Sequence, residues 1–175
     1  GDYQMEKPLL AKSIEIKKAD ILVMDSTYCF ADFSFDERNE VIGNIQKYVR
    51  QKINSGSILF GAYAVGRAQE LIKIMNEIGI VPTVSEDIAK IGNVYKKSFS
   101  RLYFSQYIPG DELKGNFVGI FTRKKELAVL ESMAKNGKRA FTAVATGWAK
   151  VFRLDADVQF PLSDHADLRQ ALEYV

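Results

Sequence analysis

The chain has 175 residues, of which 47% are hydrophobic and 26% are charged, and its formal net charge is +2 at pH 7. This size and composition are typical of a soluble globular protein of one domain, or of one domain plus part of another. No apolar run approaches the roughly 20 residues that span a bilayer, and the single cysteine, Cys29, excludes an internal disulfide. We therefore expect a cytoplasmic protein without a membrane partner.

Short apolar runs alternate with amphipathic segments along the chain, which favours an α/β fold with a mainly parallel sheet flanked by helices. Strands are expected at residues 21–24, 57–61, 80–84, 117–121, 141–144 and 158–162. Helices are expected at residues 41–53, 65–78, 85–95 and 122–136, and from residue 163 or 164 to the end. Residues 98–107 fit no single pattern.

Polar clusters follow three of the expected strands. They are Asp25-Ser26-Thr27, the stretch from Gly61 to Glu70, and Ser163-Asp164-His165-Ala166-Asp167. Ligands and catalytic groups gather beyond the carboxyl ends of parallel strands, so these clusters are candidates for a site. Each also has a structural alternative, because Asp, Ser and Gly are common in turns and caps and a lone histidine is often structural.

The clusters resemble the motifs of one family, the β-CASP nucleases of the metallo-β-lactamase superfamily. Asp25 to Tyr28 resembles motif A, and Phe160 to Asp167 resembles motif B. Gly1-Asp2, with Lys7 to Leu10 behind it, is similar to the segment that begins with motif 4. Tyr63 to Leu71 and Thr146-Gly147-Trp148 also resemble segments of these nucleases. The matches follow one another in the family's order over nearly the whole chain.

The resemblance implies a three-part organisation. Residues 1–33 would belong to the C-terminal part of a metallo-β-lactamase αββα core, and residues 34–142 to the inserted β-CASP domain. Residues 143–175 would return to the core. The fold implied is thus a β-CASP-type sheet with parts of the metallo-β-lactamase core at both ends.

The resemblance also implies a chemistry. In this family two zinc ions activate a water molecule and polarise a phosphodiester. Asp2 would be the carboxylate that bridges the metals, and His165 would be the general acid, oriented by Asp25. The family more often has Glu than Asp at motif A, so we expect the contact from Asp25 to His165 to be longer or to need a small shift.

The metal ligands are the main departure from the family. The family binds zinc with several histidines, whereas this sequence has only His165. We expect the missing ligands to lie outside the two ends of the chain. Alone, the chain is then expected neither to hold two zinc ions nor to cleave nucleic acid, and the remainder of the core is an expected partner.

Substrate contacts are expected from Gly66, Arg67, Thr146 and Gly147. The helix that begins near Gly66 would offer unpaired N–H groups to phosphate, while Arg67 would bind phosphate or, slightly favoured, a carboxylate such as Glu70. Other basic side chains are expected on a solvated surface. Three aromatic residues would stack on bases or, more in keeping with their type, pack between layers: Tyr103, Phe104 and Tyr107.

The leading hypothesis is part of a zinc-dependent nuclease that cleaves RNA, of the mRNA 3′-end processing type. A DNA exonuclease of the same superfamily, such as the DNA ligase-associated type that cleaves single-stranded DNA, is the nearest alternative. A non-catalytic subunit that binds nucleic acid or a partner is another, and a homodimer is compatible with all of these. A small nucleotide-binding domain is less favoured, because the chain has no phosphate-loop or dinucleotide fingerprint.

Overall fold

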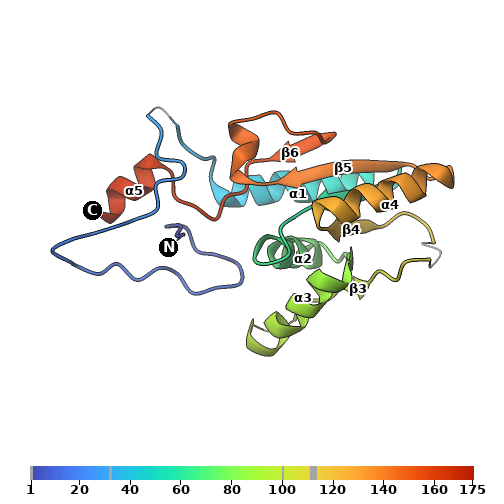
Figure 1. The fold of residues 1–175 in the computed structure, drawn as a ribbon, viewed down its shortest axis with the longest axis horizontal. Helices are drawn as coiled ribbons and strands as arrows, with labels where there is room; N and C mark the ends of the chain where they lie inside the picture. The colour runs from blue at the N-terminus through green and yellow to red at the C-terminus, as the bar shows by residue number, and fades with distance from the viewer. Residues whose placement is uncertain (1, 32, 100, 111–113) are drawn as a thin grey trace.

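The computed structural model describes residues 2–31, 33–99, 101–110 and 114–175. Its centre is a six-stranded sheet in the order β3-β2-β4-β1-β5-β6, in which every neighbouring pair is parallel. Five α-helices accompany the sheet (Figure 1). The expected α/β fold with a mainly parallel sheet is therefore confirmed.

The strands are β1 (Ser57–Gly61), β2 (Thr83–Val84), β3 (Ser105–Gln106), β4 (Val118–Phe121), β5 (Ala140–Ala145) and β6 (Val158–Phe160). The helices are α1 (Arg38–Lys52), α2 (Arg67–Glu77), α3 (Glu86–Phe99), α4 (Arg123–Lys135) and α5 (Leu168–Tyr174), with a short 3-10 helix, η1 (Gly147–Lys150). None of these helices is long and apolar enough to cross a membrane.

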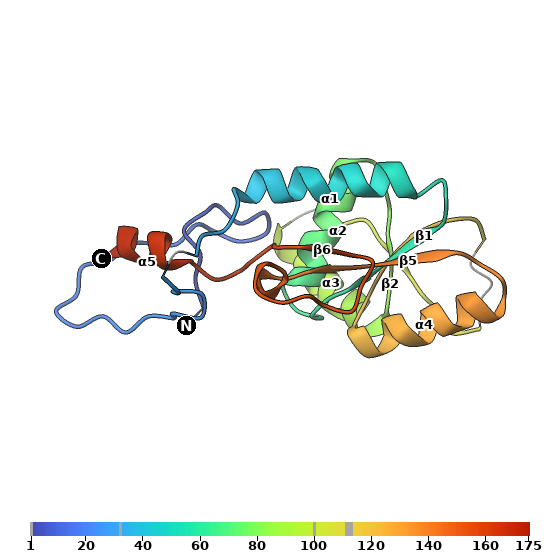
Figure 2. The ribbon, with the colours of Figure 1, turned by 90° about the horizontal axis from the view of Figure 1, so that it is seen from above.

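The central strand β1 is buried from both sides. Ile58 and Phe60 belong to the larger apolar cluster, which also contains residues of α1, α2 and α3, whereas Leu59 belongs to a smaller cluster with Val129 and Met133 of α4. Alternate residues of a strand face opposite sides of its sheet. Helix α4 therefore covers one face and α1 to α3 cover the other, and Figure 2 shows α1 and α4 on opposite sides of the sheet.

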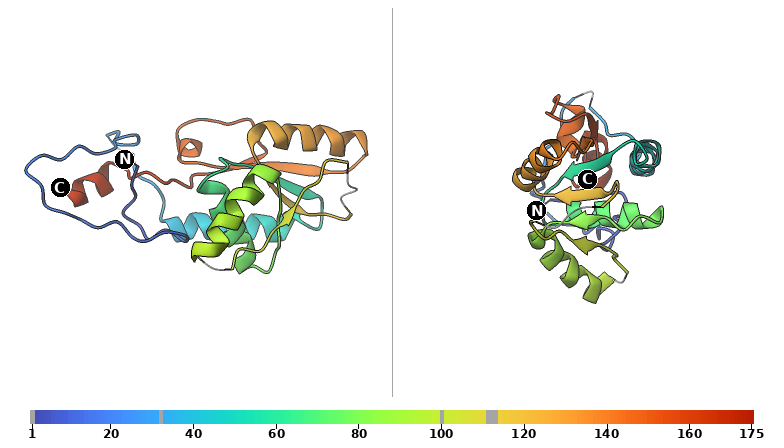
Figure 3. Two further views of the ribbon diagram at one scale, coloured as in Figure 1. Left: turned by 60° about the horizontal axis from the view of Figure 1, so that its bottom comes forward. Right: turned by 90° about the vertical axis from the view of Figure 1, so that its right-hand side faces the viewer.

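Most of the N-terminal segment lies beside α5 (Figure 1), although Leu9 and Leu10 pack against the larger apolar cluster. Figures 1 and 3 show these two ends of the chain side by side beyond one end of the sheet. The Ala166 N–H donates to the Tyr3 carbonyl at 2.8 Å, and Tyr28 forms a parallel bridge with Asp167. The Phe35 N–H also donates to the Asp167 carboxylate at 2.9 Å. Long-range contacts thus bring residues near both termini to one place.

The strand expected at residues 21–24 is wrong. Ile21 and Val23 are 85% and 89% exposed, and the structure assigns no strand to this stretch. A strand needs a partner for its backbone groups, and none of the described residues pairs with this stretch. The apolar run therefore predicted a strand that the chain, by itself, does not form.

The other expected elements are present with shifted ends. The last helix begins at Leu168 rather than at residue 163 or 164, because Asp167 caps it in a capping box with Gln170. Residues 98–107 contain the end of α3 and the short β3.

The expected division between residues 142 and 143 falls inside β5. Gly1 and Asp32 lie outside the described residues. The three-part organisation stays a prediction.

Candidate active site

His165 and Asp25 are in direct contact. The Nδ1 atom of His165 lies 2.7 Å from the Asp25 carboxylate, although the two residues are 140 positions apart. Their side chains are 27% and 14% exposed. The contact that the sequence predicts is therefore present and is not lengthened, while the alternative of a small shift stays a prediction.

Asp25 is held by its own turn. Its Oδ1 atom accepts hydrogen bonds from the Thr27 hydroxyl at 2.6 Å and from the Thr27 N–H at 3.1 Å. Burial raises the pKa of the Asp25 carboxyl, but the hydrogen bonds from Thr27 and His165 outweigh it, so the pKa lies below its usual value of 3.8. The carboxylate is thus kept in the charged form that binds the Nδ1–H of His165.

The backbone of His165 is fixed by Ser163. The Ser163 hydroxyl accepts from the His165 N–H at 3.0 Å and lies 3.0 Å from the His165 carbonyl. The Tyr28 ring packs edge-on against the imidazole, with ring centroids 5.7 Å apart. Burial raises the pKa of Tyr28 to about 12, so its phenol stays neutral beside the histidine. The Nε2 atom is then the ring nitrogen that remains for chemistry.

Asp2 lies on the Nε2 side of His165. One of its carboxylate oxygens is 3.9 Å from Nε2, and the ligand atoms of Asp2, Asp25 and His165 all lie within 4.8 Å of one another. This is the one group of potential metal ligands found among the described residues. Asp25 is bonded to Nδ1, which leaves Asp2 and the Nε2 atom. These are fewer than the three protein ligands of a catalytic zinc ion, and far fewer than two zinc ions need. The chain's own described residues do not fit a dinuclear zinc centre.

A network of ions, buried except at Asp164, ties this site to helices α1 and α2. Arg67 is 4% exposed and pairs with Glu70 at 2.5 Å and with Asp164, the neighbour of His165, at 2.9 Å. Arg38 pairs with the same Glu70 and donates to the Ser163 carbonyl at 2.6 Å. These contacts support the structural alternative for Arg67, whose guanidinium is occupied by carboxylates.

Two of the N–H groups at the start of α2, where a phosphate site is expected, are already paired. The N–H groups of Arg67 and Ala68 already donate to the carbonyls of Val65 and Tyr63, at 3.0 and 3.2 Å. Gly66 precedes the helix with a φ of 78°, a conformation that glycine adopts without strain. Gly66 therefore serves the turn and the N–H groups of Arg67 and Ala68 are paired, while substrate contacts at Gly66 and Arg67 stay a prediction.

Thr146 and Gly147 lie next to Tyr28 rather than next to His165. The Thr146 hydroxyl caps η1 by accepting from the Trp148 N–H at 3.4 Å. A Cβ atom on Gly147 would come within 2.7 Å of the Tyr28 ring, so the glycine allows Tyr28 to pack there. Their role as substrate contacts stays a prediction.

Two residues that contact the site, Arg38 and Tyr28, were not predicted from the sequence. Arg38 had no local signal, because its partners Glu70 and Ser163 are 32 and 125 residues away. Tyr28 stood inside the motif A resemblance without an assigned role. Elsewhere, Phe104 packs against the main core and Tyr107 against Phe121, which favours the packing alternative for both.

Comparisons with known proteins give two partial likenesses. No protein-family profile matches the chain. The chain is 27% identical to a probable DNA ligase of Opitutus terrae over 183 residues, which cover all of this chain and 17% of that protein. It is 30% identical to cleavage and polyadenylation specificity factor 73 of Drosophila melanogaster over 111 residues, which cover 61% of this chain and 15% of that protein. The chain thus spans about a sixth of the length of these curated relatives.

Proposed function

We propose that this chain is part of a metal-dependent phosphodiesterase that cleaves nucleic acid, with His165 as its general acid. The observation that carries the proposal is the 2.7 Å contact between Asp25 and Nδ1 of His165, which leaves Nε2 directed away from that carboxylate. The likenesses to a probable DNA ligase and to a cleavage and polyadenylation factor support a relative of nucleic-acid-processing proteins.

The proposed role of His165 follows from the bond that breaks. Hydrolysis of a phosphodiester breaks a P–O bond, and the leaving oxygen must gain a proton. Protonated at Nε2, His165 donates this proton, while the Asp25 carboxylate stabilises the imidazolium and fixes the ring by accepting from Nδ1–H. Thr27 and Ser163 hold the two residues in this orientation.

Metal enters the proposal only with further ligands. Two zinc ions, as the family resemblance implies, require donors that the described residues of this chain lack. In a polypeptide or complex that supplies those donors, Asp2 is the carboxylate that this chain adds. RNA is the proposed substrate, because the relative whose name refers to cleavage is a polyadenylation factor, and single-stranded DNA is the nearest alternative.

The test is cleavage of end-labelled single-stranded RNA and DNA by the polypeptide or complex that contains the remaining ligands. General acid catalysis contributes about 10²–10⁴-fold, so His165→Ala is expected to lower the cleavage rate by that factor without loss of bound zinc. Asp25→Asn should lower it less, because the imidazole remains. Wild-type rates for His165→Ala would rule out the acid role.

A second function is a non-catalytic subunit that binds nucleic acid. The small number of metal ligands among the described residues favours this alternative. It predicts binding of the same oligonucleotides without cleavage, and no effect of His165→Ala on the activity of the assembly.

A further inference from the structure

A pocket of about 700 Å³ opens at the carboxyl edge of the sheet. Its floor is formed where β1 and β4 end, at Gly61 to Ala64 and at Thr122 and Arg123. β1 leads into α2 and β4 leads into α4, and these helices cover opposite faces of the sheet. The chain therefore diverges between two adjacent strands, which is the position where open α/β sheets bind ligands.

The far wall of the pocket is the loop after η1, and hydrogen bonds hold this loop in place. The Gln159 amide donates to the carbonyls of Ala149 and Phe152 at 2.5 and 3.0 Å and accepts from the Leu154 N–H at 2.9 Å. The Arg123 guanidinium donates to the Asp155 carbonyl at 2.6 Å and thereby joins the loop to the start of α4. These hydrogen bonds therefore fix the shape of the pocket.

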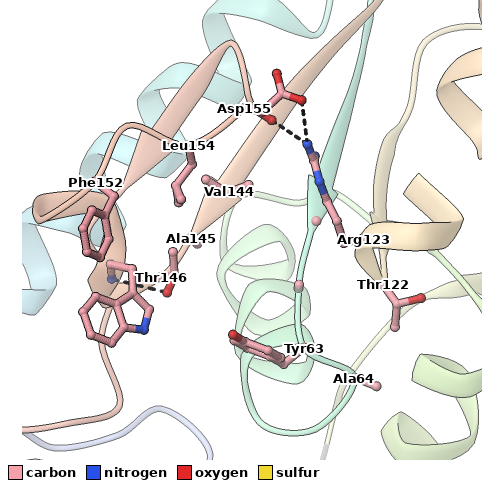
Figure 4. A pocket seen from close by; sticks show the side chains of 13 residues that line it. Tyr63, Ala64, Thr122, Arg123, Val144, Ala145, Thr146, Phe152, Leu154 and Asp155 are labelled. Atoms are coloured by element: carbon pink, nitrogen blue, oxygen red, sulfur yellow. Dashed lines mark hydrogen bonds and ion pairs between the residues drawn. The ribbon is translucent and has the colours of Figure 1, made fainter. Parts of the chain in front are cut away.

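The lining suits a flat, apolar ring rather than a phosphate. Figure 4 shows Tyr63 and Phe152 on different sides of the pocket, with Ala145 and Thr146 between them, and Val144 also lines it. Among the described residues, Arg123 is the single cation that lines the pocket, and it is paired with Glu126 at 2.7 Å and with Asp155. An anion would therefore find no unpaired cation in this part of the described structure.

The pocket also adjoins the candidate active site. Trp148 lines it and stacks on Phe152, with ring centroids 5.5 Å apart. On its other side Trp148 contacts the Tyr28 ring, with centroids 4.8 Å apart, and Tyr28 contacts His165. A group bound against Trp148 is thus linked to the general acid through Trp148 and the Tyr28 ring.

We propose that this pocket binds one unpaired nucleobase of a single-stranded nucleic acid whose backbone passes His165. The proposal rests on the proposed function and adds a subsite to it. Aromatic side chains stack on bases of any sequence, and the pocket-lining Tyr63 and Phe152 are accessible, with exposed fractions of 72% and 56%. The Thr122 side chain, which makes no capping hydrogen bond with α4, can pair with a polar edge of the base.

The experiment uses Trp148, the single tryptophan of the chain, as a reporter inside the pocket. Its fluorescence is followed while the 175-residue chain is titrated with short single-stranded RNA and DNA of the same sequence, and with an abasic DNA of the same length. The expected result is quenching by the strands with bases and at least about tenfold weaker binding of the abasic strand. Equal binding of the abasic strand, or no change in fluorescence, would overturn the proposal.

Two exposed side chains, one inside the pocket and one outside it, provide a test variant and a control. Tyr63→Ala is expected to weaken binding by about tenfold, whereas Tyr63→Phe keeps the ring and should bind like the wild type. Val94→Ala is the control, because Val94 of α3 is 61% exposed and does not line the pocket. Both residues are exposed, so the variants are expected to fold. An equal effect of Tyr63→Ala and Val94→Ala would count against the pocket.

The failures of the two proposals can be told apart. Base-dependent binding by the chain together with no cleavage by the assembly that holds the metal would refute the proposed function and keep the base pocket. Cleavage that depends on His165 but is unaffected by Tyr63→Ala and by removal of bases would refute the base pocket and keep the proposed function. The RNA and DNA arms show which sugar the subsite accepts.

Discussion

At the scale of single residues, the site is a histidine whose orientation is set by two hydrogen-bonding neighbours. Asp25 accepts from the ring and is itself held by Thr27, while Ser163 fixes the backbone of His165. A carboxylate that accepts several hydrogen bonds favours its charged form. The low pKa of Asp25 therefore links the geometry of the site to the stability of the fold.

This link predicts a pH-dependent effect of Asp25→Asn. The folded-state pKa of Asp25 lies below its ordinary value of 3.8, so the unfolded chain binds the proton more tightly. The stabilisation from the carboxylate is present above that ordinary value and is lost as the pH falls through the lower, folded-state pKa. We expect the free energy of unfolding of the wild type to exceed that of Asp25→Asn by about 1–3 kcal/mol near pH 5 and by much less near pH 2.5.

Urea unfolding of the chain at a series of pH values, followed by Trp148 fluorescence, measures this difference. Asp20→Asn is the control, because Asp20 lies on the exposed N-terminal segment and its substitution should leave the pH dependence unchanged. Parallel stability curves for the wild type and Asp25→Asn would show that the carboxylate is not stabilised in the folded state.

At the scale of elements, the helices and strands that were predicted correctly are those whose local hydrophobic pattern is enough to specify them. The buried run of β1 and the amphipathic face of α2 form close to their expected bounds, because packing against the sheet rewards both patterns. The apolar run at residues 21–24 has the same local signal but no pairing partner among the described residues. The beginning of α5 was misplaced because two residues, Ser163 and Asp167, can each cap a helix and the capping box with Gln170 decides between them.

The position of Gly147 at the start of η1 predicts that Gly147→Ala lowers the stability of the protein. The added Cβ would lie 2.7 Å from the Tyr28 ring and 3.0 Å from that of Phe35, so the buried tyrosine must move. Overpacking of this kind costs about 1–3 kcal/mol. Tyr28 touches the imidazole, so the NMR signal of His165, the single histidine, should shift as well.

Gly43→Ala is the matched control for this substitution. Gly43 lies on the exposed side of α1 with no atom within 4 Å of an added Cβ. Alanine is favoured over glycine within a helix by about 1 kcal/mol, so this variant should be at least as stable as the wild type. Equal stability of Gly147→Ala would mean that Tyr28 is not held where the structure places it.

At the scale of the whole molecule, the candidate site depends on contacts that no local pattern announces. The motif resemblance predicted the contact between Asp25 and His165 from the sequence, because motifs of one family occupy fixed positions in its fold. It did not reveal Arg38, which joins α1 to Glu70 of α2 and to Ser163 beside the site. The role of such a residue becomes clear only from the packed structure. From the sequence alone, an arginine in a helix is expected to be an ordinary surface residue.

Arg38 therefore provides the strongest stability prediction for the molecule. It is 7% exposed, and it bonds Glu70, the Ser163 carbonyl at 2.6 Å and the Gln4 side chain at 2.8 Å. Arg67 still pairs with Glu70 when Arg38 is removed, so the cost is smaller than the roughly 3–5 kcal/mol of a buried charge left with no partner. Hydrogen bonds to charged groups contribute about 1.5–3 kcal/mol, and Arg38→Ala should lower the free energy of unfolding by that amount.

Two further variants test this account of Arg38. Arg38→Lys should lose an intermediate amount, because an ammonium group cannot reproduce the planar fork that reaches three partners. Lys90→Ala, which removes an exposed ion pair with Glu86 on α3, is the control and should change stability by less than about 1 kcal/mol. Urea unfolding and the His165 NMR signal are the two measurements. A loss for Arg38→Ala as small as that for Lys90→Ala would contradict the buried network, and an unshifted His165 signal would show that the network does not reach the site.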